Sequence, residues 1–250
     1  MKKYLLIVVA ASVIFTENSQ AQATSRVVDL GLSVYWASCN VGANSPEEVG
    51  GYYAWGEVEE KDFYGDNYAY STSETSFQDI GTDISGTQYD VAKMKWGDAW
   101  RMPTLTEWNE LKNNCSWSWT NQSGVNGVKI TGPNGNSIFL PAGGRKYGDR
   151  GLRDFNEYGC YWTSTLSSNV GTNSSAEFFL FYSSGKAIEG RNRINGMAVR
   201  PVTNDATATG IVSIKGENKQ TISIYNLRGQ RLAAPQKGIN IIGGKKMVVK

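Results

Sequence analysis

The sequence predicts an α+β domain that consists mostly of antiparallel sheet, with two short helices, long loops and a small all-β appendage at its C-terminal end. Three observations favour this class. Many short segments alternate apolar and polar residues, turn-forming residues separate them, and only two segments have helical spacing. Short strands joined by tight turns pair with their chain neighbours, so an antiparallel arrangement follows.

The clearest helix signal lies in Trp96–Trp108, WGDAWRMPTLTEW. Thr104 and Glu107 have the T-x-x-E spacing of a capping box, in which each side chain bonds a free N–H of the first helical turn. Apolar residues then recur at helical spacing over Leu105–Leu111. A second, shorter helix is expected at Asp90–Lys95.

Short alternating segments predict the strands, and two pairs of them surround turns that indicate hairpins, Gly132–Gly135 and Ser183–Gly185. The segments Asp62–Ser85 and Ala142–Gly159 lack periodicity and are expected to be loops. The expected strands are Val27–Val34, Val34–Cys39, Gly50–Glu57, Val125–Ile130, Ser137–Leu140, Cys160–Thr165, Ala176–Tyr182, Lys186–Arg191 and Ala198–Val202.

The first residues have the pattern of a cleaved secretory signal peptide, expected over residues 1–23. Two lysines precede the apolar segment Leu5–Phe15, and A-x-A-like cleavage sites end at Ala21 or Ala23. The apolar run is too short to span a bilayer, and no later run replaces it. We therefore expect an exported chain, secreted or at the cell surface, with no transmembrane segment.

Charge is distributed unevenly along the chain. Residues 24–202 have 15 Lys and Arg against 20 Asp and Glu, a net charge of −5, whereas residues 203–250 have 8 against 2, a net charge of +6. Because the globular part is acidic, a nucleic-acid-binding face is not expected on it.

The C-terminal part divides into a linker at 203–209 and a small β domain at 210–250 with three strand-like runs, Gly210–Ile214, Thr221–Tyr225 and Lys245–Val249. Its runs IYNLRGQRL and PQKGINIIGGKKMVVK resemble the C-terminal sorting domain used with type IX secretion in Bacteroidota. That resemblance implies attachment at the outer membrane or cell surface. A small β appendage that packs on its own core is the alternative.

Three blocks, Trp96–Trp108, Gly159–Thr165 (GCYWTST) and Gly196–Val202 (GMAVRPV), together resemble the major paralogous domain family first described in Fibrobacter. The resemblance covers Val27–Val202 and implies that residues 24–202 form a C-type-lectin-like domain. Formylglycine-generating enzymes and the target proteins of diversity-generating retroelements share that fold.

Composition excludes several kinds of catalysis. The chain has no histidine, which removes Ser-His-Asp and Cys-His catalysis, the common zinc sites and the usual proton shuttle near neutral pH. Formylglycine-generating relatives use a late pair of cysteines, and no cysteine follows Cys160. A disulfide between two of the three cysteines, Cys39, Cys115 and Cys160, and burial of the thiols as small apolar groups are both open.

Two weaker possibilities involve oxygen-rich side chains. A structural Ca²⁺ site would need scattered Asp and Asn ligands, since no compact ligand string occurs, so we expect no cofactor and no metal. A carboxylate-dependent glycoside hydrolase could use the cluster Glu57, Glu59, Glu60 and Asp62. Adjacent acids beside a polar loop are more typical of a solvated edge.

Aromatic residues divide into a core group and a loop group. Trp117 and Trp119 alternate with serine and are expected on one face of a strand. The tyrosines of the polar loop, Tyr64, Tyr68 and Tyr70, either contact a ligand or pack on the sheet. The residues expected in the core are Trp36, Trp96, Trp100, Trp108, Trp162, Phe179 and Phe181.

In the retroelement-target relatives, the ligand face lies just before the final strand and in neighbouring loops. The segment GRNRING at that position supports such a face, because two Arg and two Asn between glycines form either a solvated turn or a polar recognition surface. The expected face comprises Glu189, Arg191, Asn192, Arg193 and Asn195, with Lys186, Arg153, Asn156 and Tyr158 around it.

These observations favour a secreted or cell-surface, non-catalytic binding module whose loop patch contacts an extracellular protein or glycan. A structural or adhesive subunit of a cell-envelope or fimbria-like assembly is the alternative. A carboxylate-dependent glycoside hydrolase is a third hypothesis.

Overall fold

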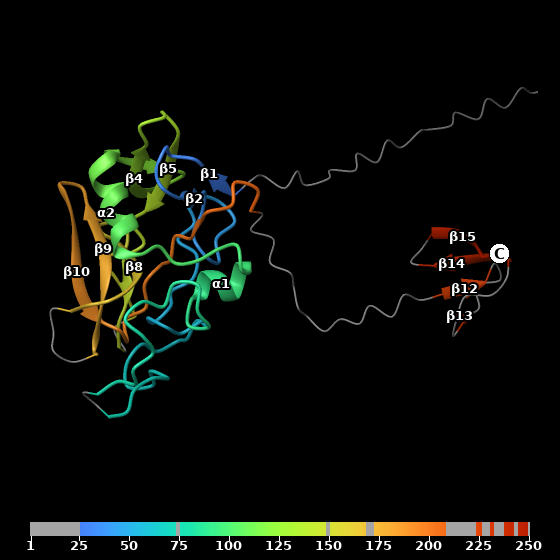
Figure 1. Cartoon of the computed structure of the whole chain (residues 1–250), viewed down its shortest axis with the longest axis horizontal. Helices are drawn as coiled ribbons and strands as arrows, with labels where there is room; N and C mark the ends of the chain where they lie inside the picture. Colours follow the sequence, from blue (N-terminus) through green and yellow to red (C-terminus); the bar gives the residue numbers. More distant parts are fainter. Residues whose placement is uncertain are drawn as a thin grey trace, which may run out of the picture. The chain divides into compact units, whose positions relative to one another are not determined.

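A computed structural model describes residues 26–73, 76–148, 151–168 and 173–208 of the 250-residue chain, together with the strand backbone at 224–226, 231–232, 238–242 and 245–249. The chain divides between Ile211 and Val212 into a larger and a smaller compact unit. Figure 1 labels both helices and many of the strands. The predicted signal peptide, residues 1–23, lies outside the described residues.

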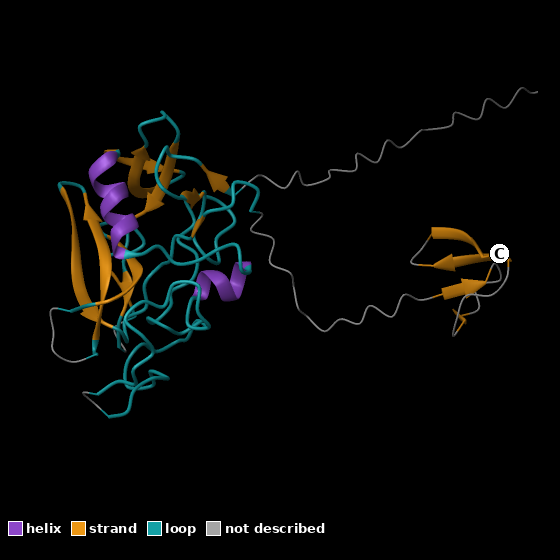
Figure 2. Ribbon diagram, in the orientation of Figure 1, coloured by secondary structure: helices purple, strands orange, loops and turns teal. Residues whose placement is uncertain are grey.

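The described strands of the larger unit form four antiparallel sheets, shown in Figure 2. Two are built from consecutive hairpins, a third joins the first two strands to the last one, and the fourth is a two-stranded pair. With two short helices, this arrangement confirms the predicted mostly antiparallel α+β class. The sheets are β3 (Ser116–Gln122) with β4 (Val125–Thr131) and β5 (Ser137–Pro141); β8 (Gly159–Leu166) with β9 (Ser175–Tyr182) and β10 (Gly185–Asn192); β1 (Val27–Val28) with β2 (Tyr35–Ala37) and β11 (Val202–Thr203); and β6 (Arg145–Lys146) with β7 (Leu152–Arg153).

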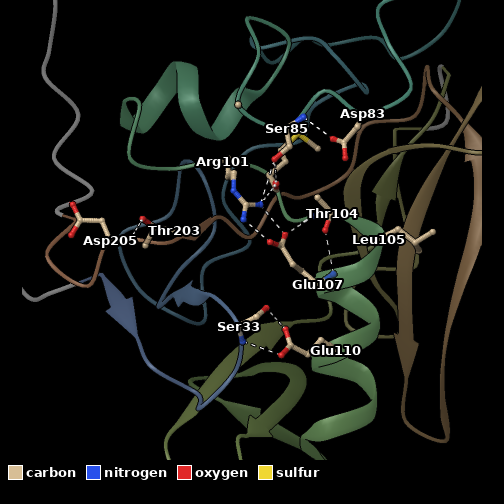
Figure 3. Close-up of polar contacts among 12 residues, drawn as sticks. Ser33, Asp83, Ser85, Arg101, Thr104, Leu105, Glu107, Glu110, Thr203 and Asp205 are labelled. Carbon is tan, nitrogen blue, oxygen red and sulfur yellow. Dashed lines mark hydrogen bonds and ion pairs between the residues drawn. The ribbon is translucent and has the colours of Figure 1, made fainter.

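The helices α1 (Val91–Trp96) and α2 (Leu105–Asn114) lie where they were expected, and α2 begins directly after its predicted capping residue Thr104. Thr104 Oγ1 accepts the Glu107 N–H at 3.2 Å, and Glu107 Oε2 accepts the Thr104 N–H at 2.8 Å, which confirms the capping box. Arg101 Nη1 donates to the same carboxylate at 2.8 Å (Figure 3). Burial opposes ionisation of Glu107, but the bonds from Arg101 and Thr104 outweigh it, so the pKa of Glu107 lies below its ordinary value.

Helix α2 packs on β8 and β9, and its Trp108 lies at the centre of the main core. The Trp108 ring stacks on Phe179 with the ring centroids 4.7 Å apart, and Trp36 meets its edge at 4.9 Å. On the outer side of the helix, Glu110 accepts the backbone N–H of Ser33 at 2.9 Å and also the Ser33 hydroxyl (Figure 3). The helix is therefore held from both sides.

The predicted core residues are buried. All seven of them have exposed fractions of 5% or less, so the assignment of tryptophan to the core is confirmed. Trp117 and Trp119 are half-buried and pack together against that core, on one face of β3 as expected. The three cysteines, all within the described residues, are free, and burial raises the pKa of the Cys160 thiol to about 12.

The predicted strand Gly50–Glu57 is wrong, since only Tyr53 forms a bridge, to Met197. The expected alternation nevertheless holds, because Tyr53 and Trp55 join one core cluster while Tyr52 and Ala54 join another. Both faces of the segment are covered by loops and side chains, so the segment is buried although it does not pair with a neighbouring strand over several residues.

Further boundaries differ from the expectations. Of the expected strands Val27–Val34 and Val34–Cys39, only Val27–Val28 and Tyr35–Ala37 form strands. Ala198–Val202 is not a continuous strand: Ala198 forms a single parallel bridge to Tyr161, and β11 begins only at Val202. Residues 203–208, expected in a linker, lie within the larger unit, where Thr203 pairs with Tyr35 and Ala208 packs beside Trp96 and Trp100.

The long polar segment Asp62–Ser85 is a loop as expected, but it is anchored by aromatic rings. Tyr64 and Tyr68 are buried, and Tyr68 donates its hydroxyl proton to the carbonyl of Trp55 at 2.6 Å. Of the two alternatives for these tyrosines, packing on the domain is therefore the observed one for Tyr64 and Tyr68.

The smaller unit is a four-stranded antiparallel sheet within the described residues, in the order β13 (Arg231–Leu232), β12 (Ile224–Asn226), β14 (Gly238–Ile242) and β15 (Lys245–Val249). The predicted run Lys245–Val249 is confirmed, Thr221–Tyr225 overlaps β12, and Gly210–Ile214 lies outside the described residues. Neither helix in the described parts of the chain has the length and apolar character needed to cross a membrane.

Candidate ligand-binding site

An open hollow of about 440 Å³ is bordered by the β6–β7 pair on one side and by the end of β10 and the turn after it on the other. Three of its lining residues are arginines, and none is aliphatic. We call it the arginine hollow. Its lining residues are Arg145, Tyr147, Arg153, Asp154, Arg191, Asn192 and Asn195.

Four residues of the patch expected from the sequence meet in this hollow: Arg153, Arg191, Asn192 and Asn195. The first comes from β7 and the others from the end of β10 and the turn after it, so the tertiary structure joins two distant parts of the chain. The central part of the expected patch is thus a continuous lining of polar side chains.

Gly144 sets the position of the first wall. It has φ +64°, a conformation that favours glycine, and a Cβ built on it would lie 1.9 Å from the carbonyl oxygen of Arg153. This close approach lets β6 and β7 pair, with Arg145 opposite Arg153 and Lys146 opposite Leu152. The two arginines consequently stand side by side on one small ribbon.

The turn after β7 is fixed by hydrogen bonds rather than by apolar contacts. Asp154 and Asn156 both have positive φ, and Asn156 is held by Asn126, whose N–H donates to Asn156 Oδ1 at 3.0 Å and whose Nδ2 donates to the Asn156 carbonyl at 3.1 Å. The Gly144 N–H donates to the Tyr158 carbonyl at 2.7 Å. This wall is therefore preorganised, which lowers the entropic cost of binding.

The second wall is a turn closed by asparagine side chains. Asn192 Oδ1 accepts the Ile194 N–H at 3.1 Å, and Asn195 Nδ2 donates to the Asn192 carbonyl at 2.9 Å. Among the described residues, the Nδ2 group of Asn192 and the Oδ1 atom of Asn195 have no hydrogen-bond partner. One donor group and one acceptor thus remain available on the lining.

Ion pairs in and beside the hollow are loose. Arg145 Nη2 lies 3.6 Å from Asp154 Oδ2, and Arg191 Nη2 lies 3.7 Å from Glu189 Oε2. The Arg191 guanidinium lies over the Phe178 ring at 5.5 Å, and its buried Nε finds no acceptor in the described part of the chain. The side chain of the exposed Arg153 has no ion pair or hydrogen bond with any described residue. The hollow therefore holds guanidinium groups with unused donors.

Arg193 is not part of a recognition surface, which corrects the expectation from the sequence. Its side chain is 1% exposed and lies between Trp55, Tyr68 and Phe77, with the guanidinium carbon 4.8 Å from the Trp55 ring. Its Nε donates to the Tyr68 hydroxyl at 2.9 Å, and its Nη1 donates to the carbonyls of Gln78 and Asn173. Arg193 thus fastens the long loop to the domain.

The remaining expected residues do not line the hollow. Glu189 is exposed and pairs with Arg191, Asn156 holds the turn as described, and the Tyr158 ring packs against Tyr182 with the centroids 5.4 Å apart. Lys186 lies at the other end of β10, over the Trp117 ring. Lys186 and Tyr158 therefore do not belong to the same surface as Arg191.

Sequence reasoning missed Arg145, Tyr147 and Asp154. All three lie in the segment that was expected to be a plain loop, although RKYGDRGLR has charged and apolar residues on both sides of two glycines. That pattern indicates a short hairpin, and it could have placed Arg145 opposite Arg153.

The acidic cluster is engaged in structural contacts. Glu57 is buried, pairs with Lys61 at 2.7 Å and accepts the Ala69 N–H, while Glu60 accepts the Tyr52 N–H. Glu59 pairs with a lysine on α1. The described residues contain no group of three or more acidic, cysteine or histidine side chains arranged to hold a metal ion.

Comparisons of the chain with protein-family models, with curated proteins and with solved structures found no match. The geometry of the arginine hollow is therefore the foundation of the functional proposal.

Proposed function

We propose that the chain is a secreted or cell-surface binding module that acts without catalysis and contacts an extracellular protein or glycan through the arginine hollow. In this proposal the larger unit is a C-type-lectin-like domain of the major paralogous family, and the C-terminal unit serves surface attachment. The observation that carries the proposal is the convergence of Arg145, Arg153 and Arg191 with two asparagines in one open hollow.

The chemistry of the lining supports binding rather than bond cleavage. Guanidinium and amide groups form several directed hydrogen bonds to a ligand, and arginine is enriched among residues that dominate binding energies. The one acid in the lining, Asp154, has no second carboxylate beside it there, and burial raises the pKa of the Cys160 thiol to about 12, which opposes formation of a thiolate.

Binding of the full chain to arrays of glycans and of extracellular proteins tests this proposal. We expect bound ligands to be lost by the double variant Arg153→Ala/Arg191→Ala and kept by Lys129→Ala, which removes an exposed cation from β4. Retention of every ligand by the double variant would show that the hollow is not the binding surface.

A structural or adhesive role is the second candidate, and one observation favours it. Strand β10 has eight residues and lies at the edge of its sheet, paired within the described residues only with β9. An unpaired edge of this length can join a second chain. Concentration-dependent self-association in sedimentation experiments, abolished by Ile188→Pro but not by the double arginine variant, would support this role.

A further inference from the structure

We propose that the arginine hollow binds the carboxylate-bearing ring of an acidic glycan, such as a uronic acid unit. This inference rests on the proposed binding function and names the class of its ligand. Three features of the hollow carry it: unbalanced positive charge, unpaired amide groups and an exposed aromatic ring.

Positive charge in the lining exceeds negative charge, with three arginines against one aspartate. Arg145 and Arg191 are held only by loose ion pairs, at 3.6 Å to Asp154 and 3.7 Å to Glu189, and the side chain of Arg153 has no ion pair or hydrogen bond with any described residue. Since residues 24–202 have a net charge of −5, this positive site stands out from the rest of the domain. A planar guanidinium matches a carboxylate through two parallel hydrogen bonds.

The unpaired amide groups suit sugar hydroxyls. A hydroxyl both donates and accepts, and the lining offers the free Nδ2 group of Asn192 and the free Oδ1 atom of Asn195. Tyr147 is 48% exposed, so its ring can cover the apolar face of a sugar while its hydroxyl stays in water. The guanidinium groups match the carboxylate of an acidic sugar unit, the asparagine amides match its hydroxyls, and the tyrosine ring matches its apolar face.

An acidic peptide fits the same hollow less well. Peptide partners anchor themselves with apolar or aromatic side chains in pockets, and the lining has no aliphatic side chain that would form one. Leu152 and Phe155 are exposed in the same segment, but neither lines the hollow. A volume of about 440 Å³ in an open hollow suits a sugar unit that enters from the side of a chain.

Calorimetric titration of the full chain with a short oligogalacturonate tests the proposal. Its methyl ester is the neutral control of the same shape, and a hexaglutamate peptide carries the same charge on a different backbone. We expect binding of the oligogalacturonate only, and weakening as salt rises from about 0.05 to 0.5 M, because exposed charges are screened.

Single variants locate the site. Arg153→Ala and Arg191→Ala are each expected to weaken oligogalacturonate binding about tenfold or more, whereas Lys129→Ala, which removes the same charge elsewhere, changes it less than about twofold. Arg153→Lys keeps the charge without the planar fork, so it should bind more weakly than the wild type and more tightly than Arg153→Ala. Circular dichroism confirms that each variant is folded.

Several results would overturn the proposal: no binding of oligogalacturonate, equal binding of its methyl ester, preference for hexaglutamate, or unchanged binding by the arginine variants. These results differ from failure of the proposed function. If array ligands are still lost by Arg153→Ala/Arg191→Ala while oligogalacturonate does not bind, the hollow is a binding site for another chemistry and only the acidic-glycan assignment fails.

Discussion

Arg191 and Arg193 are two residues apart at the end of the same hairpin, yet they serve different parts of the molecule. Arg191 borders the arginine hollow with an exposed side-chain fraction of 38%, whereas Arg193 is 1% exposed and lies among aromatic rings. Arg200 resembles Arg193, since it is fully buried and donates to the carbonyls of Ala37 and Phe139 and to Asn40 Oδ1.

The difference shows what makes an arginine structural in this fold. Arg193 and Arg200 have no carboxylate partner among the described residues, but backbone carbonyls and hydroxyl or amide oxygens replace most of the water that they lose, and only Nη2 of Arg193 has no acceptor there. Burial lowers the pKa of Arg200, which reflects the cost of keeping this charge out of water. The arginines of the hollow are more exposed and make only loose ion pairs or none, so their guanidinium groups remain available to a ligand.

Arg200→Met gives the largest expected effect on stability. The change leaves the carbonyls of Ala37 and Phe139 and the Asn40 amide oxygen without their donor in a buried place, which we expect to lower the free energy of unfolding by about 4 kcal/mol. Urea unfolding followed by tryptophan fluorescence measures it. A variant as stable as the wild type would contradict the structural role of Arg200.

The pair Arg193→Leu and Arg191→Leu tests the comparison directly. Arg193→Leu removes the donor to Tyr68 and to two carbonyls and the contact with Trp55, so we expect a loss of about 3 kcal/mol in the free energy of unfolding. Arg191→Leu should change it by less than about 0.5 kcal/mol, because the half-buried guanidinium makes only a loose ion pair and no hydrogen bond with the described residues. Equal losses of stability for Arg193→Leu and Arg191→Leu in urea unfolding would contradict the distinction between a structural Arg193 and a ligand-facing Arg191.

Gly144→Ala tests how the wall of the hollow is positioned, with Gly148→Ala as the matched control. Both glycines have positive φ, but a Cβ meets the Arg153 carbonyl only at Gly144 and has open space at Gly148. We expect Gly148→Ala to cost about 1 kcal/mol and Gly144→Ala about 2 kcal/mol or more, with loss of ligand binding only in the latter. Similar unfolding curves and similar ligand binding for Gly144→Ala and Gly148→Ala would show that the contact between Gly144 and the Arg153 carbonyl does not position β7.

Apart from the control variants, Glu107→Gln gives the smallest expected effect on stability, and this effect depends on pH. Because the pKa of Glu107 in the folded protein lies below its ordinary value of 4.5, the ionised carboxylate stabilises the fold above that pH, and this contribution disappears as pH falls through the folded-state pKa. Glutamine keeps the capping box but not the charge, so the variant should be about 1 kcal/mol less stable at pH 6.

The two proteins should approach each other in stability as pH falls through the lowered pKa of Glu107, since protonation removes the charge from the wild type as well. Urea unfolding at a series of pH values below neutrality measures how the difference narrows. A constant gap between wild type and Glu107→Gln would mean that the ion pair with Arg101 does not contribute to the pH dependence.

Local sequence signals predicted the elements whose causes are local. The capping box of α2 depends on residues three apart, and the two hairpins depend on turns of three or four residues, so both appeared where expected. The strand prediction for Gly50–Glu57 failed because alternating residues of this segment are buried on two faces. Burial by loops produces the same sequence pattern as burial in a sheet.

The ligand-binding patch was predicted only in part, because a local segment does not show which of its side chains become buried. The segment GRNRING identified the region, but nothing within it distinguishes Arg191 from Arg193. Arg193 is buried because Trp55, Tyr68 and Gln78 close around it, and the last of these lies 115 residues away in the sequence. Arg145 was missed because its significance depends on its pairing with Arg153.

The sequence by itself determined the α+β class, the tryptophan core, the approximate positions of both helices and the turns of two hairpins, because periodicity, capping and turn formation act over a few residues. Only the tertiary structure decided which polar residues are buried and which meet in a hollow. Burial and convergence depend on contacts between residues far apart in the chain, and those contacts exist only once the sheets and loops have packed together.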